Sequence, residues 1–340
     1  MLPASTPWQP LFTIERSGKP EVTVYGMVSV VAGMPLAPGA ARNFETLIAT
    51  ENTGFEVWSR STLKPWQLLS HFNILKEAYP ALRDEHLALF MASHSAEPLH
   101  IDLLKEACLI CQVSEENLKC PPAKPVKEEV EKSLRRYHNC SGKHIGYLAA
   151  LKAQGASLSD YLKESEAHHT RLKHILSVLT GRIDFDYTTD GCQLPNYALS
   201  IEELASLYNT LVREELPSQE PIFSNYRELG RLMHKCPRII SGAGRLDLRI
   251  MNGELLGERD FYMLAKEGAD GLLSAAVSPN ANYPYGLGIC IKLSSGFDNR
   301  HMEIIFKEIL RQTGLYEPKV KIAKDDVRTD HIKTRFHFHI

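Results

Sequence analysis

The sequence VTVYGMVSVVAG, Val22–Gly33, establishes a β-strand near the N-terminus of this chain. The stretch is rich in β-branched residues and ends in glycine, a composition typical of a strand. The preceding segment Phe12–Arg16 is the predicted pairing partner of this strand. A sheet therefore begins within the first part of the sequence.

Two more strands are expected near the other end of the chain. GLLSAAV, Gly271–Val277, and GLGICIKLSSG, Gly286–Gly296, flank the turn-rich SPNANYPY, and RHMEIIFKEILRQTG, Arg300–Gly314, has the pattern of a closing helix. Apolar residues recur at three- and four-residue spacing through much of 65–235, which indicates helices. We predict an α+β fold in which N- and C-terminal strands form one antiparallel sheet with a large helical region.

The chain of 340 residues is long enough for a large core. We predict a single catalytic domain over 1–340, with a sheet from about 10–60 and 240–315, a helical region of about 65–235, and a C-terminal tail, 318–340. The last residues, TRFHFHI, alternate aromatic and polar residues and fit either an edge strand or a frayed tail.

Composition excludes several classes of function. With 44% hydrophobic and 24% charged residues and a formal net charge of -2, the chain offers no basic face for nucleic acid. The N-terminus has no secretion signal, and no apolar run approaches the roughly 20 residues that span a bilayer. We therefore expect a cytoplasmic protein that binds a small molecule and no membrane. Its seven cysteines would be free thiols or metal ligands in that reducing compartment.

The motif HNCSGKH, His138–His144, joins a cysteine and a lysine three residues apart, and DGC adds a second thiol at Cys192. A lysine usually carries a proton, but beside Zn²⁺ and two thiolates its pKa can fall far enough to free the lone pair. Cys140, Lys143 and Cys192 would then leave a fourth position open for water or substrate. Asp190 is placed to bind that water or an ammonium group. The alternative is a pair of buried structural thiols.

The motif RSTLKPWQ places Ser61 and Lys64 in S-x-x-K spacing at a predicted helix start, just before Pro65. One helical turn brings both side chains to the same face. A serine hydroxyl needs a base to take its proton, and a lysine with a lowered pKa can be that base. The spacing is common by chance, so a helix cap with a solvated lysine is the alternative.

Two further motifs carry hydroxyl and amine groups. MASHSAEPLH presents Ser93, His94 and Ser95 after an apolar helix, toward a pocket or as a capped helix end. AKEGADG places Lys266 and Gly268 directly before the strand GLLSAAV, as in the K-T-G element of serine penicilloyl enzymes. Without the pair of Ser61 and Lys64, the AKEGADG motif would be interpreted as an ordinary turn.

Other candidates for metal binding are interpreted as structural. Cys108 and Cys111 have C-x-x-C spacing but fall on the apolar side of a helix, which predicts core thiols. His168 and His169 in EAHHTRLKH are predicted to lie on the solvated face of a helix. Neither pair is expected to hold a metal.

Taken together and in this order, RSTLKPWQ, ASHSAEP, HNCSGKH, DGC and KEGADG resemble the zinc-containing L-asparaginase II family, the rhizobial-type (class 3) asparaginases. The resemblance extends from about Arg16 to about Leu315, and HNCSGKH and DGC are its most specific parts. It implies a fold like that of serine β-lactamases, penicillin-binding proteins and serine-dependent glutaminases. It also implies a homodimer that hydrolyses L-asparagine to L-aspartate and ammonia.

The resemblance assigns roles to ten residues. Ser61 would be the nucleophile with Lys64 as its base, and Ser93 and Lys266 would form a second Ser-Lys pair facing the first. The expected zinc ligands are Cys140, Lys143 and Cys192. The expected contacts to the amino and carboxylate ends of the substrate are Arg60, His144 and Asp190. One departure stands beside these motifs, since the family more often has glycine at the position of Ala96.

The predicted mechanism is amide hydrolysis through an acyl-enzyme. Ser61 would attack the side-chain amide carbon of asparagine, ammonia would leave, and water would then release aspartate. Zinc would order the substrate-binding loops and orient Asp190 rather than activate water. Three rivals stay open at this point: a glutaminase or other amidase with the same chemistry, a penicillin-interacting acyl enzyme, and a non-catalytic protein that zinc stabilises.

Overall fold

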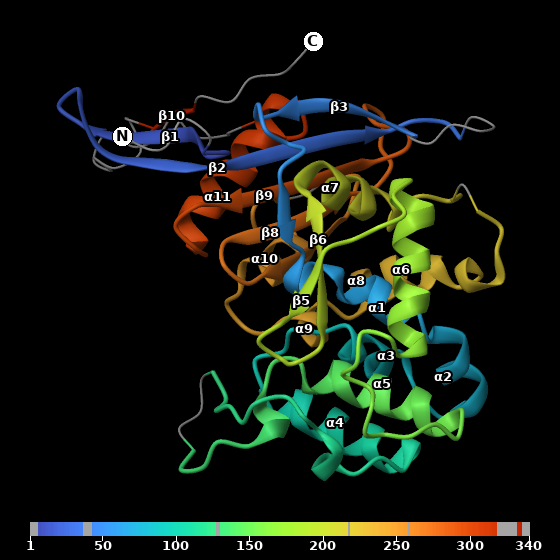
Figure 1. Cartoon of the computed structure of the whole chain (residues 1–340). Coiled ribbons are helices and arrows are strands. Elements are labelled where there is room, and N and C mark those ends of the chain that lie inside the picture. The colour runs from blue at the N-terminus through green and yellow to red at the C-terminus, as the bar shows by residue number, and fades with distance from the viewer. Residues whose placement is uncertain are drawn as a thin grey trace. The chain divides into compact units, whose positions relative to one another are not determined.

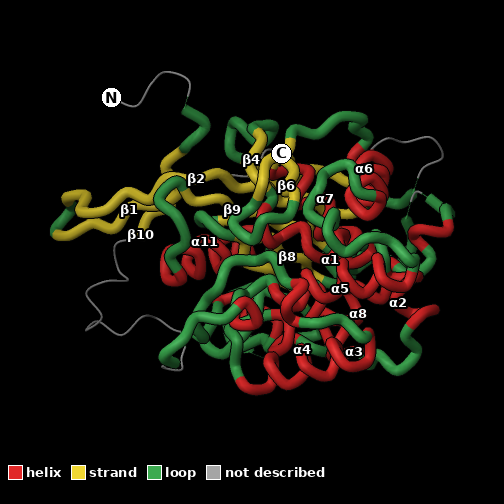
Figure 2. The backbone as a smooth tube through the Cα atoms, turned by 60° about the horizontal axis from the view of Figure 1, so that its bottom comes forward, coloured by secondary structure: helices red, strands yellow, loops and turns green. Residues whose placement is uncertain are grey.

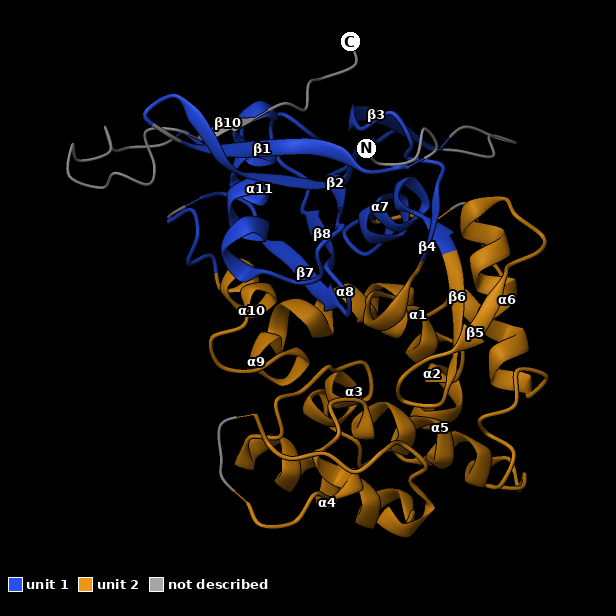
Figure 3. Ribbon diagram, turned by 60° about the vertical axis from the view of Figure 1, so that its left-hand side comes forward, with its two compact units in different colours: residues 1–57, 199–213, 253–340 blue, residues 58–198, 214–252 orange. Residues whose placement is uncertain are grey.

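The structure is a computed structural model, and it describes residues 6–36, 43–126, 130–216, 218–257, 259–317 and 332–334 (Figure 1). The chain divides into two compact units (Figure 3). Unit 1 contains Met1–Val57, Leu199–Arg213 and Gly253–Ile340, and unit 2 contains Trp58–Ala198 and Glu214–Asn252.

Unit 1 is built on a seven-stranded sheet whose strand order is β10-β1-β2-β9-β8-β7, with β3 also paired to β2. Every described pairing in this sheet is antiparallel. The strands are β1 (Gln9–Arg16), β2 (Lys19–Gly33), β3 (Phe44–Ala49), β7 (Met263–Gly268), β8 (Leu272–Val277), β9 (Leu287–Leu293) and β10 (Ile332–Thr334). The predicted α+β fold is therefore confirmed, including the hairpin between the first two strands and the junction of N- and C-terminal strands at β2 and β9.

The central part of this sheet is covered by helices. Helix α7 (Ile201–Thr210) packs against β2, β8 and β9, and α11 (Asn299–Gln312) packs against β9. A glycine in β9 permits the first contact, because a Cβ atom at Gly288 would lie 1.9 Å from the carbonyl oxygen of Ala205. The α11 helix confirms the predicted closing helix.

Unit 2 is mainly helical, and its helices α1–α5 and α8 gather together in two views (Figures 1 and 2). Its α-helices are α1 (Lys64–Leu69), α2 (Phe72–Ala78), α3 (Asp84–Phe90), α4 (Pro98–Cys111), α5 (Ser141–Ala153), α6 (Ala167–Thr180), α8 (Tyr226–Lys235), α9 (Pro237–Ile240) and α10 (Leu246–Met251). Short 3₁₀ turns are η1 (Arg60–Leu63), η2 (Glu115–Asn117), η3 (Arg135–Tyr137) and η4 (Pro221–Phe223). A second sheet has the order β4-β6-β5, formed by β4 (Glu56–Trp58), β6 (Pro195–Ser200) and β5 (Tyr187–Thr189).

Helix α5 is buried inside unit 2. Its residues from Ser141 to Leu151 are all buried, and it packs against α2, α3 and α4. A helix that is apolar or small on every side is buried on every side. The N-terminal end of α5 carries the HNCSGKH motif, so the motif is fixed within the core of the unit.

Three local predictions need correction or fall outside the description. The charged stretch VKEEVEKSLRRYH, 126–138, has the sequence pattern of a helix, but its described part forms only the turn η3 and a bridge from Leu134 to Ala123. His168 and His169 are 0% exposed, not solvated, because they pack on Tyr147 and His71. The tail contributes β10, and 335–340 lie outside the described residues.

The structure also shows where Cys108 and Cys111 lie. Cys111 is fully buried and Cys108 is half-buried, as expected of structural thiols. Burial raises the pKa of both thiols to about 12, so neither is a thiolate at neutral pH.

Within the described ranges, no helix combines the length and the apolar character needed to cross a lipid bilayer.

Candidate active site

The Ser61 motif lies where a strand passes into a helix. Strand β4 ends at Trp58, η1 follows, and α1 begins at Lys64 with proline in its first turn, as predicted. Asn196 of β6 holds this turn, because its Oδ1 accepts hydrogen bonds from the Ser59 hydroxyl at 3.0 Å and from the Arg60 amide at 2.9 Å. The turn that presents Ser61 is thus anchored by a residue that the sequence did not indicate.

Lys64 contacts Ser93 rather than Ser61. Its Nζ donates to the Ser93 Oγ at 2.9 Å and to the carbonyl oxygen of Ala92, and both Lys64 and Ser93 are buried. Burial lowers the pKa of Lys64, and the nearby Cys140 opposes that shift. Ser61 is half-buried, and within the described part of the chain its hydroxyl makes no hydrogen bond to Lys64. The structure therefore joins one lysine to the second predicted serine and leaves the first serine more accessible.

The loop that follows α3 presents Ser93, and His94 fixes this loop to the start of α5. The Ser141 hydroxyl donates to the Arg136 carbonyl oxygen at 2.9 Å, so it must accept from His94 Nε2 at 2.9 Å. The Nδ1 of His94 in turn accepts the Ala96 amide at 3.1 Å. Burial lowers the pKa of His94 well below its usual value. His94 is thus a neutral, fully hydrogen-bonded link between the Ser93 loop and the HNCSGKH motif.

A second set of contacts holds the same loop from the segment before α10. Arg245 donates to the Ser93 carbonyl oxygen, and the Ser93 amide donates to the Ile240 carbonyl at 2.9 Å. The carboxylate of Glu97 accepts the Ala243 amide at 2.6 Å and also pairs with Arg238. The sequence of this segment, SGAGRLDL, 241–248, is typical of a glycine-rich turn and does not indicate these contacts.

Three residues with positive φ flank the predicted site residues. Arg60 has φ 49°, Ala96 has φ 55° and Gln193 has φ 77°. Each costs about 1–2 kcal/mol in an L-residue, and such backbone strain concentrates at functional sites. Glycine would adopt the conformation of Ala96 without this strain.

The two thiols and the lysine amine of the predicted zinc site come together. Lys143 Nζ lies 3.3 Å from the Sγ of Cys192, and the Cys192 thiol lies 3.7 Å from the Asp190 carboxylate. A hydrogen bond from Cys192, together with the charges of Lys64 and Lys143, holds the pKa of Cys140 well below its usual value. All three predicted ligands are buried. The motif therefore forms one polar cluster inside unit 2.

The donor set of this cluster fits a zinc ion by its chemistry. Two sulfur atoms and one nitrogen atom are ligands that zinc prefers, and both cysteines are free thiols. Among the described residues, no group of three or more histidine, cysteine or acidic side chains is arranged to hold a metal. The predicted set differs from such groups because its third donor is a lysine.

The remaining predicted residues divide between the two units. Arg60 and Asp190 form an ion pair at 2.8 Å, and His144 lies on α5 directly after Lys143. Burial lowers the pKa of His144 well below its usual value. Lys266 is buried on β7 of unit 1, which is an edge strand of the described sheet path as expected. The pairing of Lys266 with Ser93 stays a prediction.

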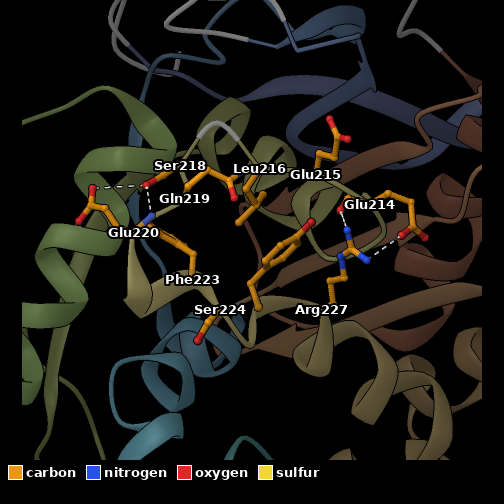
Figure 4. A pocket seen from close by; sticks show the side chains of 10 residues that line it. Glu214, Glu215, Leu216, Ser218, Gln219, Glu220, Phe223, Ser224 and Arg227 are labelled. Atoms are coloured by element: carbon orange, nitrogen blue, oxygen red, sulfur yellow. Dashed lines mark hydrogen bonds and ion pairs between the residues drawn. The ribbon is translucent and has the colours of Figure 1, made fainter.

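A separate cavity of about 520 Å³ lies in unit 2 between Glu214 and Arg227 (Figure 4). Its lining includes three glutamates and two aromatic side chains, and Glu214 pairs with Arg227 at 3.2 Å. None of the ten predicted site residues lines this cavity. It is therefore distinct from the cluster around Lys64.

The model of one protein family, described as L-asparaginase II, matches residues 15–337. The chain belongs to the L-asparaginase II family. This L-asparaginase is accordingly an amidohydrolase that acts on a small-molecule substrate. A search among curated proteins found no match.

Several solved structures are distantly similar to this L-asparaginase. A variant of the class A β-lactamase from the last common ancestor of Gram-negative bacteria has 11% identity and a TM-score of 0.40, covering 84% of this chain and 90% of its own. A probable glutaminase from Bacillus subtilis has 12% identity and a TM-score of 0.36, covering 85% of each chain. A D,D-transpeptidase domain from Legionella pneumophila has 12% identity and a TM-score of 0.35, covering 85% of this chain and 88% of its own. Likeness at this level supports no conclusion about activity.

Proposed function

We propose that this L-asparaginase hydrolyses the side-chain amide of L-asparagine through a Ser-Lys acyl-enzyme, beside a zinc site. The observation that carries the proposal is the buried amine of Lys64, hydrogen-bonded to Ser93 and one helical turn after Ser61. Burial lowers the pKa of Lys64, and a lysine with a lowered pKa can take the proton of a nearby serine nucleophile. No other described lysine of unit 2 combines full burial with a hydroxyl partner.

In this scheme Ser61 is the nucleophile, because it is the more accessible of the two hydroxyls. Its Oγ forms a bond to the amide carbon while its proton passes to Lys64, and that proton then leaves with ammonia. Ser93 holds the amine of Lys64 in place, and Lys266 is the proposed amine of the second Ser-Lys pair. Water then cleaves the ester and releases L-aspartate.

The three proposed substrate contacts have complementary charges. Arg60 binds a carboxylate, Asp190 binds an ammonium group, and His144 supplies a polar contact from α5. Arg60 and Asp190 pair with each other at 2.8 Å, so an amino acid would replace that ion pair with its own two charges. This exchange favours a zwitterionic ligand over a ligand with one charge.

Zinc would be held by Cys140, Lys143 and Cys192. When bound, the ion would supply a positive charge that stabilises the thiolates and orients neighbouring groups. Cys140 is the residue just before α5, Lys143 lies in the first turn of that helix, and Cys192 lies in the turn before β6. Protein without the metal is expected to keep its fold and some activity but to bind asparagine more weakly.

Four finer assignments belong to the same proposal. The enzyme is of the rhizobial, class 3 type, it forms a homodimer, it works in the cytoplasm, and its two units act as one catalytic domain. The seven cysteines are all free in the structure, which agrees with a reducing compartment.

The decisive test is ammonia release from L-asparagine and L-glutamine side by side, with zinc quantified on the same sample. Activity on asparagine is expected in the wild-type protein, and Ser61→Ala should lose several orders of magnitude in turnover. Ser177→Ala on α6 is the control, because Ser177 is also half-buried in a helix. Activity on glutamine alone would make the enzyme a glutaminase. Near-normal turnover by Ser61→Ala would refute the mechanism, and zinc without activity would favour a structural zinc protein.

A further inference from the structure

Tyr161 joins His144 to a backbone amide inside unit 2. The phenol oxygen accepts the Lys119 amide at 2.8 Å and lies 2.8 Å from His144 Nδ1. Both side chains are 0% exposed. The rings meet edge to face, with their centroids 5.4 Å apart. Because both side chains are shielded from solvent, their hydrogen-bond partners must come from the protein or from a bound ligand.

The hydrogen-bond count decides which nitrogen of His144 carries the proton. The phenol oxygen already accepts from Lys119, so its own hydrogen is free to point to Nδ1. In the opposite arrangement Nδ1 would donate, and both the phenol hydrogen and the lone pair of Nε2 would lack partners. The first arrangement leaves one group unsatisfied and the second leaves two. Tyr161 therefore donates to Nδ1, and the imidazole hydrogen lies on Nε2.

This assignment leaves a buried donor without a partner. Among the described residues, no acceptor lies within hydrogen-bond distance of His144 Nε2, and the atom is shielded from solvent. A buried N–H without a partner is costly and calls for an explanation, such as a ligand that it binds. The side chain of His144 lies near the same polar cluster, because the charges of Lys143 and Cys140 act on it.

We propose that Tyr161 is a positioning residue that fixes His144 as an Nε2–H donor for a carboxylate oxygen of the amino-acid substrate. This inference rests on the proposed function and sharpens it. A donor of this kind binds the carboxylate end of asparagine and not its ammonium group.

The first experiment reads the tautomer directly. Long-range ¹⁵N–¹H NMR of the zinc-loaded full chain, labelled on histidine, should show the Nε2–H pattern for His144, assigned through His144→Gln. In Tyr161→Phe, the spectrum of His144 should no longer show the Nε2–H form alone. A wild-type spectrum with the proton on Nδ1 would overturn the proposal, whether or not the enzyme hydrolyses asparagine.

The second experiment separates binding from turnover. Tyr161→Phe should raise KM for asparagine about tenfold, the effect of one lost hydrogen bond, with kcat changed much less. Tyr79→Phe is the matched control, because Tyr79 donates to the Ala149 carbonyl of the same helix at 3.1 Å and touches no site residue. An unchanged KM in Tyr161→Phe, with the tautomer lost, would contradict the substrate role.

Two variants of His144 cover the case in which Tyr161→Phe does not fold. His144→Gln keeps an N–H donor without needing Tyr161, and it should retain KM within about threefold. His144→Phe fills the space without a donor and should raise KM about tenfold. Equal KM values in the two variants would overturn the proposal. If neither wild type nor variants release ammonia from asparagine, the proposed function fails, while the NMR result still decides the tautomer.

Discussion

Replacing Gly242 by alanine should displace the loop that carries Ser93. A Cβ atom at Gly242 would lie 2.0 Å from the Oγ and 2.6 Å from the Cβ of Ser95, and 3.1 Å from Glu97 Oε1. Carbon atoms in contact prefer separations of about 3.5–4.0 Å, so Ser95 must move by more than about 1 Å. Ser93, whose hydroxyl accepts a hydrogen bond from Lys64, lies two residues before Ser95 and must move with it.

The magnitude follows from this displacement. Overpacking of a rigid site costs about 1–3 kcal/mol of folding free energy. A misplacement of about 1 Å at a catalytic group costs about 100-fold in rate. We therefore expect Gly242→Ala to lose about 100-fold in kcat/KM, with a modest loss in the free energy of unfolding.

The assay is ammonia release under steady-state conditions, with urea unfolding on the same samples. Gly54→Ala is the control, because a Cβ atom at Gly54 meets nothing within 4 Å. The double variant Ser95→Gly with Gly242→Ala removes the clashing atoms and should recover most of the lost activity, a positive coupling between the two sites. Full activity in Gly242→Ala, or no recovery in the double variant, would refute the reasoning.

Two further predictions concern stability. Asp84 bonds Arg231 and Lys235, which hold its pKa well below the usual value, so its contribution is present above about pH 4 and fades as the pH falls. Asp84→Asn should cost about 1 kcal/mol at pH 7 by urea unfolding, and equal costs at pH 7 and pH 3 would contradict this. Burial and the charge of Arg171 lower the pKa of His168 to about 3, so the unfolded state binds more protons and stability should fall from about pH 6.5 downward. His168→Asn should flatten that slope by up to about 1.4 kcal/mol per pH unit, and an unchanged slope would show that His168 is not its source.

The sequence predicted those features that depend on short spacing. The composition of β2 and its partner gave the hairpin, and Pro65 marked the start of α1 within one residue. The C-x-x-K spacing places Cys140 directly before α5 and Lys143 in its first turn, so part of the polar cluster could be predicted from local sequence. Family resemblance then supplied the roles that spacing could not.

Contacts between distant segments could not be predicted. The bond from Lys64 to Ser93 and the bond from Tyr161 to His144 depend on how separate helices pack, and neither has a local signal. The burial of His168 also could not be predicted from the sequence. Its polar neighbours in sequence indicate solvent, but Tyr147 and other rings bury it in the folded chain.

The most direct test of the account is the site of acylation. Rapid quenching of the enzyme with L-asparagine, followed by peptide mass spectrometry, should find an aspartyl ester on Ser61, with a burst of ammonia ahead of aspartate. Lys64→Met should abolish that ester without unfolding the protein. An ester on Ser93, or turnover with no covalent intermediate on either serine, would contradict the assignment of Ser61 as the nucleophile.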